Sequence, residues 1–87
     1  MPHHTIHARA HHAHAVLPRI LLTFSRRRLR ILALHYFHLD EDAETEIQID
    51  LECEAAMAGE LAAQLRRVIE VTDVWYEAVT PDNRAAA

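Results

Sequence analysis

Polar and apolar residues alternate from residue 3 to residue 11, a spacing that is typical of a β-strand with one buried face. The small or apolar positions are Ile6, Ala8 and Ala10, and the polar ones between them are His7, Arg9 and His11. From about residue 15 the spacing becomes helical, and the buried side of a helix would carry Val16, Leu17, Ile20, Leu21 and Phe24. Because proline lacks an N–H, we expect Pro18 in the first turn and the helix start near residue 15.

The rest of the chain repeats this change of period. Residues 29–39 are rich in branched and aromatic side chains and predict a second strand, and residues 40–43 predict a short acidic turn. The third strand has one apolar and one polar face, formed by Ile47, Ile49, Leu51 and Cys53 and by Glu46, Gln48, Asp50 and Glu52. Residues 55–69 predict a second helix with a buried side made of Met57 or Ala58, Leu61, Leu65 and Val68. Residues 71–79 predict the last strand.

This order of elements predicts an α+β fold of the ferredoxin-like βαββαβ type. Both helices would cover one face of a four-stranded antiparallel sheet. We expect one domain at residues 3–79 and a flexible tail at residues 80–87. Because so short a chain has only a modest core, we also expect it to pair with itself as a homodimer or a larger assembly.

Composition narrows the class of protein. Hydrophobic residues make up 51% of the chain and charged residues 25%, which is typical of a folded soluble domain. No apolar run approaches the roughly 20 residues that cross a bilayer, and no secretory signal pattern opens the chain. The single Cys53 allows no internal disulfide and indicates a reducing compartment. We therefore expect a cytoplasmic protein without membrane contact.

The charges and the histidines have separate implications. A net charge of −4 argues against nucleic acid as a partner. All eight histidines lie in the first 38 residues, so this half of the chain becomes cationic as the pH falls towards 6. Two pleats of a strand separate His7 from His11 by about 13 Å, and no helical His-x-x-x-His or Cys-x-x-Cys pair completes a zinc set. We expect no metal ligands, and keep a histidine-rich ferredoxin-like metal-binding protein only as a further hypothesis.

Two features concern the sheet face that the helices would leave open. The first and third strands would be neighbours there, so the polar face of residues 3–11 would oppose the acids of the third strand. Either the opposite charges of the two strands compensate each other on a solvent-exposed face, or the face is a docking surface for a second subunit. If Tyr76 follows Val74 towards the core, Trp75 lies on the open face as an interface anchor, unless the C-terminal tail covers it.

No residue has the surroundings of a catalytic group. Ser25 lacks a Gly-x-Ser-x-Gly context, and Cys53 occupies an apolar strand position where free cysteine is usually inert. Asp40, Glu41 and Asp42 are adjacent acids of the kind that water normally surrounds. We expect no enzyme activity in this chain.

Several short segments keep a joint spacing that resembles a known family. They are "HTI" at 4–6, "VLPRI" at 16–20, "FSRR" at 24–27, "LRI" at 29–31 and "LRRVIEVTDV" at 65–74. The series resembles the ACT domain of acetolactate synthase small subunits, the regulatory partners of a thiamine-diphosphate enzyme of branched-chain amino-acid synthesis. The resemblance covers about residues 4–79 and is to the short type of subunit with a single ACT domain.

The chain departs from this family at both ends of the first helix. Arg26, Arg27 and Arg28 fall in its last turn, where they are either solvent cover or a basic patch for a partner. The family has a glycine at the position of Arg28, so here either the connection takes another path or the backbone accepts strain. Effector-binding members carry Asn and Gly before the helix, where an amino acid's carboxylate meets free N–H groups. His12 and Ala15 replace them here, which implies that this loop does not bind valine.

The resemblance implies a non-catalytic subunit that binds and activates the large subunit of acetolactate synthase. Thiamine diphosphate, magnesium and flavin (FAD) would belong to the large subunit, and this chain would hold no cofactor. The candidates for contact with the partner are Arg26, Arg27, Arg30 and Trp75. The alternative is a stand-alone homodimeric amino-acid sensor of the ACT type.

Overall fold

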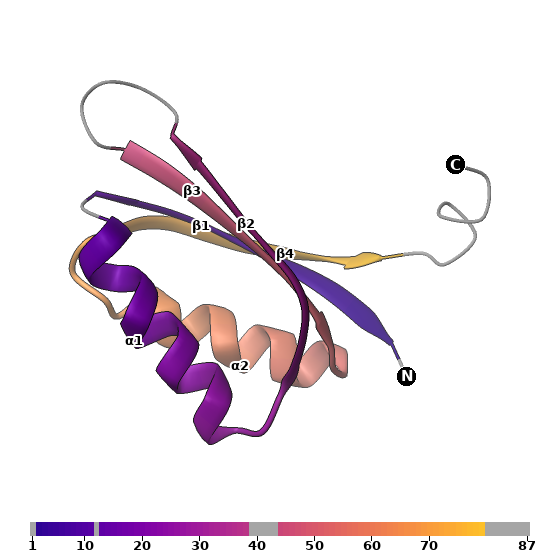
Figure 1. Cartoon of the computed structure of the whole chain (residues 1–87). Coiled ribbons are helices and arrows are strands. Elements are labelled where there is room, and N and C mark those ends of the chain that lie inside the picture. The colour runs from indigo at the N-terminus through magenta and orange to yellow at the C-terminus, as the bar shows by residue number, and fades with distance from the viewer. Residues whose placement is uncertain (1, 12, 39–43, 80–87) are drawn as a thin grey trace.

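The computed structural model describes residues 2–11, 13–38 and 44–79, so the predicted turn at 40–43 and tail at 80–87 lie outside the described residues. Six elements follow one another: β1 (His3–His11), α1 (Ala13–Arg26), β2 (Arg30–His38), β3 (Glu44–Glu52), α2 (Ala55–Leu65) and β4 (Val71–Val79). The strands form one antiparallel sheet in the order β2-β3-β1-β4. Both helices lie on the same face of it (Figure 1). The predicted ferredoxin-like βαββαβ fold is confirmed.

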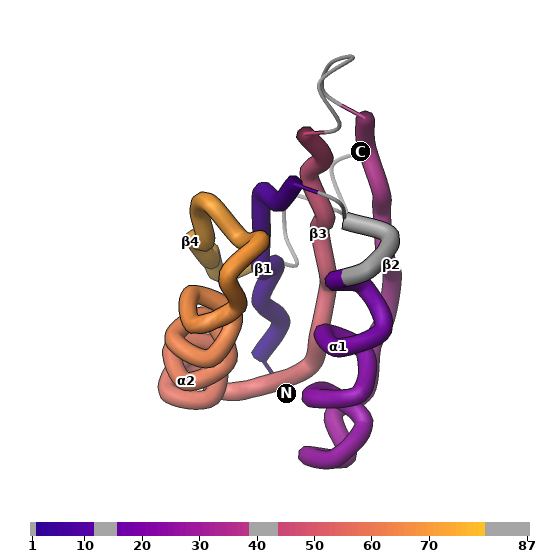
Figure 2. Tube along the Cα trace, turned by 90° about the vertical axis from the view of Figure 1, so that its left-hand side faces the viewer, coloured from indigo at the N-terminus to yellow at the C-terminus, as the bar shows by residue number. Residues whose placement is uncertain are grey.

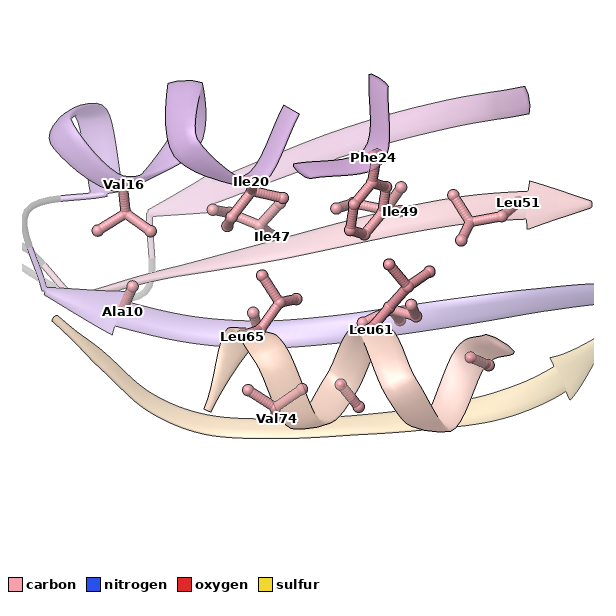
Figure 3. Close-up of a cluster of buried hydrophobic side chains, with 14 of the residues drawn as sticks. Ala10, Val16, Ile20, Phe24, Ile47, Ile49, Leu51, Leu61, Leu65 and Val74 are labelled. Atoms are coloured by element: carbon pink, nitrogen blue, oxygen red, sulfur yellow. The ribbon is translucent and has the colours of Figure 1, made fainter. Parts of the chain in front are cut away.

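The hydrophobic core lies between the sheet and the two helices (Figure 3). The alternation predicted in the third strand is confirmed, because Ile47, Ile49 and Leu51 are completely buried on the face that the helices cover. The helices add the completely or almost completely buried side chains Val16, Ile20, Phe24, Leu61 and Leu65. Each such side chain contributes about 1.5–3 kcal/mol relative to an exposed one.

Helix α1 differs from its prediction at its start. It begins at Ala13, so Pro18 lies in the second turn and not in the first. There Pro18 cannot donate the hydrogen bond to the carbonyl of residue 14, a loss of about 3 kcal/mol or more. The burial of Val16, Ile20 and Phe24 is large enough to hold the helix across this gap. The same helix leaves Leu21, which we had expected on the buried side, 37% exposed.

Helix α2 ends at Leu65, four residues before its predicted end at residue 69. After it, Arg67 N donates to Gln64 O at 3.1 Å and Val68 N to Leu65 O at 3.1 Å, which are the tighter bonds of turns. Val68 still packs against the core although the backbone has left the helix. The hydrophobic spacing therefore continues beyond the helix itself, which explains the wrong boundary.

Candidate functional site

The sheet face opposite the helices is the first candidate surface, and we call it the open face. The strand registers bring polar side chains of β1 and β3 together there, as predicted. β1 contributes His3, Thr5, His7, Arg9 and His11; β3 contributes Glu44, Glu46, Gln48, Asp50 and Glu52; β4 contributes Asp73, Trp75 and Glu77. Carboxylates therefore outnumber arginines on this face.

A cluster around His7 occupies the middle of the open face. Its Nδ1 lies 3.5 Å from Glu46 Oε2 and its Nε2 lies 3.2 Å from Glu77 Oε2. The ring stacks on Trp75 with centroids 4.9 Å apart and planes at 4°, and the guanidinium carbon of Arg9 lies 5.5 Å from the Trp75 ring. Neutral imidazole carries one N–H and imidazolium two, so only the imidazolium can donate to both carboxylates.

Glu46 is the acid that this cluster affects most. Gln48 Nε2 donates to its Oε2 at 2.8 Å, and Arg9 Nε donates to its Oε1 at 3.4 Å. The hydrogen bond from Gln48 lowers the pKa of Glu46 below its ordinary value of 4.5, burial opposes this, and His7 and Arg9 lower it further. The open face is therefore an ordered network of charges around Glu46.

Trp75 lies on the open face, as the sequence indicated, but it is only partly exposed because His7 and Arg9 cover it. Tyr76 lies on the helix-covered face with Val74, and it remains 41% exposed. A tryptophan that is already held by two neighbours loses little conformational freedom when it meets a partner.

The arginines between the end of α1 and the start of β2 lie on two surfaces, one in the helix layer and one on the sheet. Only Arg26 lies within the helix, whereas Arg27 and Arg28 follow it, so the prediction that all three occupy the last turn was wrong. Arg27 Nη1 lies 3.6 Å from the sulfur of Met57 and 3.8 Å from Glu60 Oε2, in the helix layer. Arg30 opens β2 opposite Glu52, with Nη1 and Oε1 3.7 Å apart. The four candidate contact residues therefore do not form one patch.

Arg28 ends the helix in the left-handed conformation, with φ of 56°. Leu29 N donates to Phe24 O at 3.3 Å and Arg28 N to Ser25 O at 3.0 Å, the two hydrogen bonds of a Schellman motif. Of the two outcomes that the sequence left open, the backbone thus keeps the path that suits glycine and accepts the strain.

The effector positions of the family are described only in part. His12 lies outside the described residues, and Ala15 lies in the first turn of α1. Among the described residues, no three His, Cys, Asp or Glu side chains come together to hold a metal ion. Cys53 is buried, and burial raises the pKa of its thiol.

Sequence reasoning missed exposed apolar side chains of β2 and α1, which lie on the same side of the molecule (Figure 2). We call this group the β2-edge surface; it consists of Leu21, Leu22, Leu32, Tyr36 and Phe37, each 37–52% exposed. Tyr36 lies on the helix-covered face of β2, opposite Ile47, and Phe37 on the open face, opposite Glu46. A signal was present, because apolar residues occupy neighbouring positions in "ILAL" and "YF" of β2. Such a run belongs to a strand that is covered on both faces.

Comparisons with known proteins support the fold. No family model and no curated protein matches the sequence. The acetolactate synthase small subunit of Thermotoga maritima matches in structure with a TM-score of 0.75 and 16% identity, over 93% of this chain and 49% of that chain. This chain thus spans about half the length of that subunit.

Two further structures match along nearly their whole length. The C-terminal domain of the MgtC protein from Mycobacterium tuberculosis matches with a TM-score of 0.74 and 13% identity, over 91% of this chain and 88% of that one. An uncharacterised Thermotoga maritima protein matches with a TM-score of 0.70 and 17% identity, over 90% and 96% respectively. The shared fold is the ferredoxin-like one. Neither helix in the described ranges is long and apolar enough to span a membrane.

Proposed function

We propose that the chain is a non-catalytic regulatory subunit that binds the large subunit of acetolactate synthase and activates it. The observation that carries this proposal is the likeness to an acetolactate synthase small subunit over 93% of the chain, at a TM-score of 0.75. The segments at 4–6, 16–20, 24–27, 29–31 and 65–74 resemble the same family. In this proposal thiamine diphosphate, magnesium and flavin are held by the large subunit.

To activate the enzyme, the subunit must bind two states of the large subunit with different affinities. A regulatory subunit raises turnover only by binding the competent state of the enzyme more tightly than the idle state, and each 1.4 kcal/mol of difference is about tenfold in population. The open face supports such a role, because Trp75 is held in place by His7 and Arg9 before any partner arrives. We assign this face to the contact with the large subunit.

The β2-edge surface supports a second association, between two copies of the chain. Among the described strands, β2 lies at the edge of the sheet and its outer N–H and C=O groups pair with no other strand. Its sequence contains neither lysine nor proline to discourage pairing. Antiparallel pairing of β2 with β2 of a second copy would extend the sheet and cover Leu32, Tyr36 and Phe37. The two contacts would be identical, as in a closed dimer.

Valine has no part in this proposal. His12 and Ala15 replace the residues with which effector-binding members receive a carboxylate, so we expect no valine binding at this loop. Calorimetric titration of the dimer with valine should give no heat of binding, and binding in the micromolar range would contradict this part of the proposal.

A stand-alone amino-acid sensor is the second candidate. It is favoured by the match to the uncharacterised Thermotoga maritima protein, 96% of which corresponds to this fold. A sensor would be stabilised by an amino acid without any partner protein, whereas the first candidate needs the large subunit.

Co-assembly with the suspected large subunit tests the first candidate. Size-exclusion chromatography with light scattering should show a complex, and Trp75→Ala should weaken it at least about tenfold. Ile69→Ala is the matched control, because Ile69 is 94% exposed and lies outside both surfaces. The absence of a complex at micromolar concentrations would contradict the proposal. A complex whose affinity is unchanged by Trp75→Ala would contradict only the choice of the open face as the contact.

A further inference from the structure

His7 connects two strands from the middle of the open face. It lies on β1, opposite Gln48 of β3 and Trp75 of β4. Its Nδ1 lies 3.5 Å from Glu46 Oε2 on β3, and its Nε2 lies 3.2 Å from Glu77 Oε2 on β4. The side chain is only 12% exposed, so little water reaches it. The ring therefore faces a carboxylate on each of the two strands that flank β1.

The protonation state of His7 decides whether both contacts are hydrogen bonds. A neutral imidazole has one N–H, so one of its nitrogens presents a lone pair to a carboxylate oxygen, whereas an imidazolium donates from both nitrogens. Within the described residues, Nδ1 of His7 is a buried atom without a hydrogen-bond partner. Such an atom is unfavourable, and a proton on it would be directed at Glu46. The two carboxylates therefore fit the imidazolium better than the neutral ring.

Glu46 remains ionised over the pH range that matters for a histidine. The hydrogen bond from Gln48 holds the pKa of Glu46 below its ordinary value of 4.5, although burial opposes this. Histidine side chains change charge between about pH 5 and pH 8, where Glu46 is therefore an anion. Glu77 provides the second carboxylate from β4. An imidazolium between them forms charge-assisted hydrogen bonds on both sides.

The other charges near His7 come from the same three strands. Arg9, two residues along β1, opposes a further positive charge, but its Nε donates to Glu46 Oε1 at 3.4 Å. Asp50 on β3 and Asp73 on β4 lie diagonally opposite His7 on this face. The helices cover the other face of the sheet (Figure 1). Carboxylates therefore outnumber guanidinium groups around His7 in the described part of the chain.

Trp75 links the state of His7 to the surface that a partner would meet. The imidazole and indole rings stack with centroids 4.9 Å apart and planes at 4°. An imidazolium that is bonded to two carboxylates keeps a fixed position and supports the indole, whereas a neutral ring lacks one of these bonds. A tryptophan that is already fixed loses less conformational freedom when a partner covers it.

We infer that His7 is a proton switch, whose protonation fixes the open face and raises the affinity of this face for its partner. The inference rests on the proposed contact between the open face and the large subunit, and it adds the condition under which that contact is strong. Because coupling between two binding events is reciprocal, the partner in turn favours the protonated ring. Formation of the complex near neutral pH should therefore take up a proton.

The fluorescence of Trp75 tests the switch in the chain alone, because Trp75 is the single tryptophan. Between about pH 8 and about pH 6 the fluorescence of the natural chain should change in one step, since a cation stacks on the indole only after protonation. His7→Gln should abolish the step, and Glu77→Gln should displace it towards lower pH. His11→Gln is the matched control, because it removes an exposed histidine from the same strand and face, and it should keep the step.

Three results would overturn the switch: no step in the natural chain, an equal step in His7→Gln, or a step that Glu77→Gln leaves in place. The affinity for the large subunit tests the consequence for binding. The complex should be at least about fivefold tighter at the lower pH, and His7→Gln should remove this difference. Equal affinities of the natural chain at both pH values would overturn the link to binding. The absence of a complex at both pH values would contradict the proposed function, and the fluorescence of the chain alone would still decide whether His7 is the switch.

Discussion

Single residues carry two features that the hydrophobic pattern does not express: the backbone strain at Arg28 and the charge network around Glu46. Arg28 has a φ of 56° within an otherwise regular helix stop. The sequence identified it as unusual, because a glycine was expected there, but could not say whether the backbone would change path. The hydrogen bonds from Leu29 and Arg28 back to Phe24 and Ser25 hold the path that suits glycine.

Replacing Arg28 with glycine should therefore stabilise the fold. We expect Arg28→Gly to raise the free energy of unfolding by about 1 kcal/mol, measured by urea denaturation, because the left-handed conformation is no longer penalised. Arg26→Gly, inside the helix, should lower it by up to about 1 kcal/mol. A loss of stability in Arg28→Gly would show that the strain assigned here is absent.

Glu46 should make stability depend on pH. Its pKa is lower in the folded chain than the ordinary 4.5, so its contribution is present above that pH and is lost as the pH falls through the folded value. Thermal unfolding between neutral pH and about pH 3 should therefore show a smaller loss of stability in Glu46→Gln than in the natural chain. Glu44→Gln, which removes a carboxylate from the same strand and face, is the matched control. Identical pH profiles for the natural chain and Glu46→Gln would contradict the role assigned to Glu46.

At the scale of elements, the order of strands and helices followed from the sequence because the period of hydrophobicity changes cleanly between them. Two helix boundaries could not be predicted from the sequence. Core packing holds α1 together across Pro18, so the helix starts earlier than expected. Val68 stays in the core after α2 has ended, so the hydrophobic spacing runs past the helix. The β2-edge surface was also missed. The residues of β2 suggest burial on both faces, and one chain leaves Phe37 44% exposed and Tyr36 39% exposed.

A charge on β2 should disrupt the proposed pairing of two copies. We expect the natural chain to be a dimer in sedimentation experiments, and Phe37→Lys to raise its dissociation constant at least about tenfold, because a lysine on an edge strand opposes pairing. The monomer should tolerate this change, since residue 37 lies opposite Glu46. Ile69→Lys should leave the dimer intact. A natural chain that is monomeric, or a Phe37→Lys variant that dimerises equally well, would contradict this interface.

For the whole molecule, the fold alone does not identify the partner. At 13–17% identity the same fold occurs in an MgtC C-terminal domain, an uncharacterised protein and an acetolactate synthase small subunit. The spacing of short segments suggested the last of these, and the open face was predictable from strand order and alternation. The cavity lined by Leu29, Cys53 and Met57 was not predictable, because the turn after α1 and the start of α2 are far apart in the sequence and come together only on folding.

Turnover by the suspected large subunit of acetolactate synthase, measured with and without this chain, tests the central claim most directly. A regulatory subunit should raise turnover at saturating substrate, with a response that reaches a plateau at a fixed ratio of the two chains, and the chain alone should have no activity. If turnover stays the same over a range of ratios while both proteins remain folded, the chain is not an activator of that enzyme.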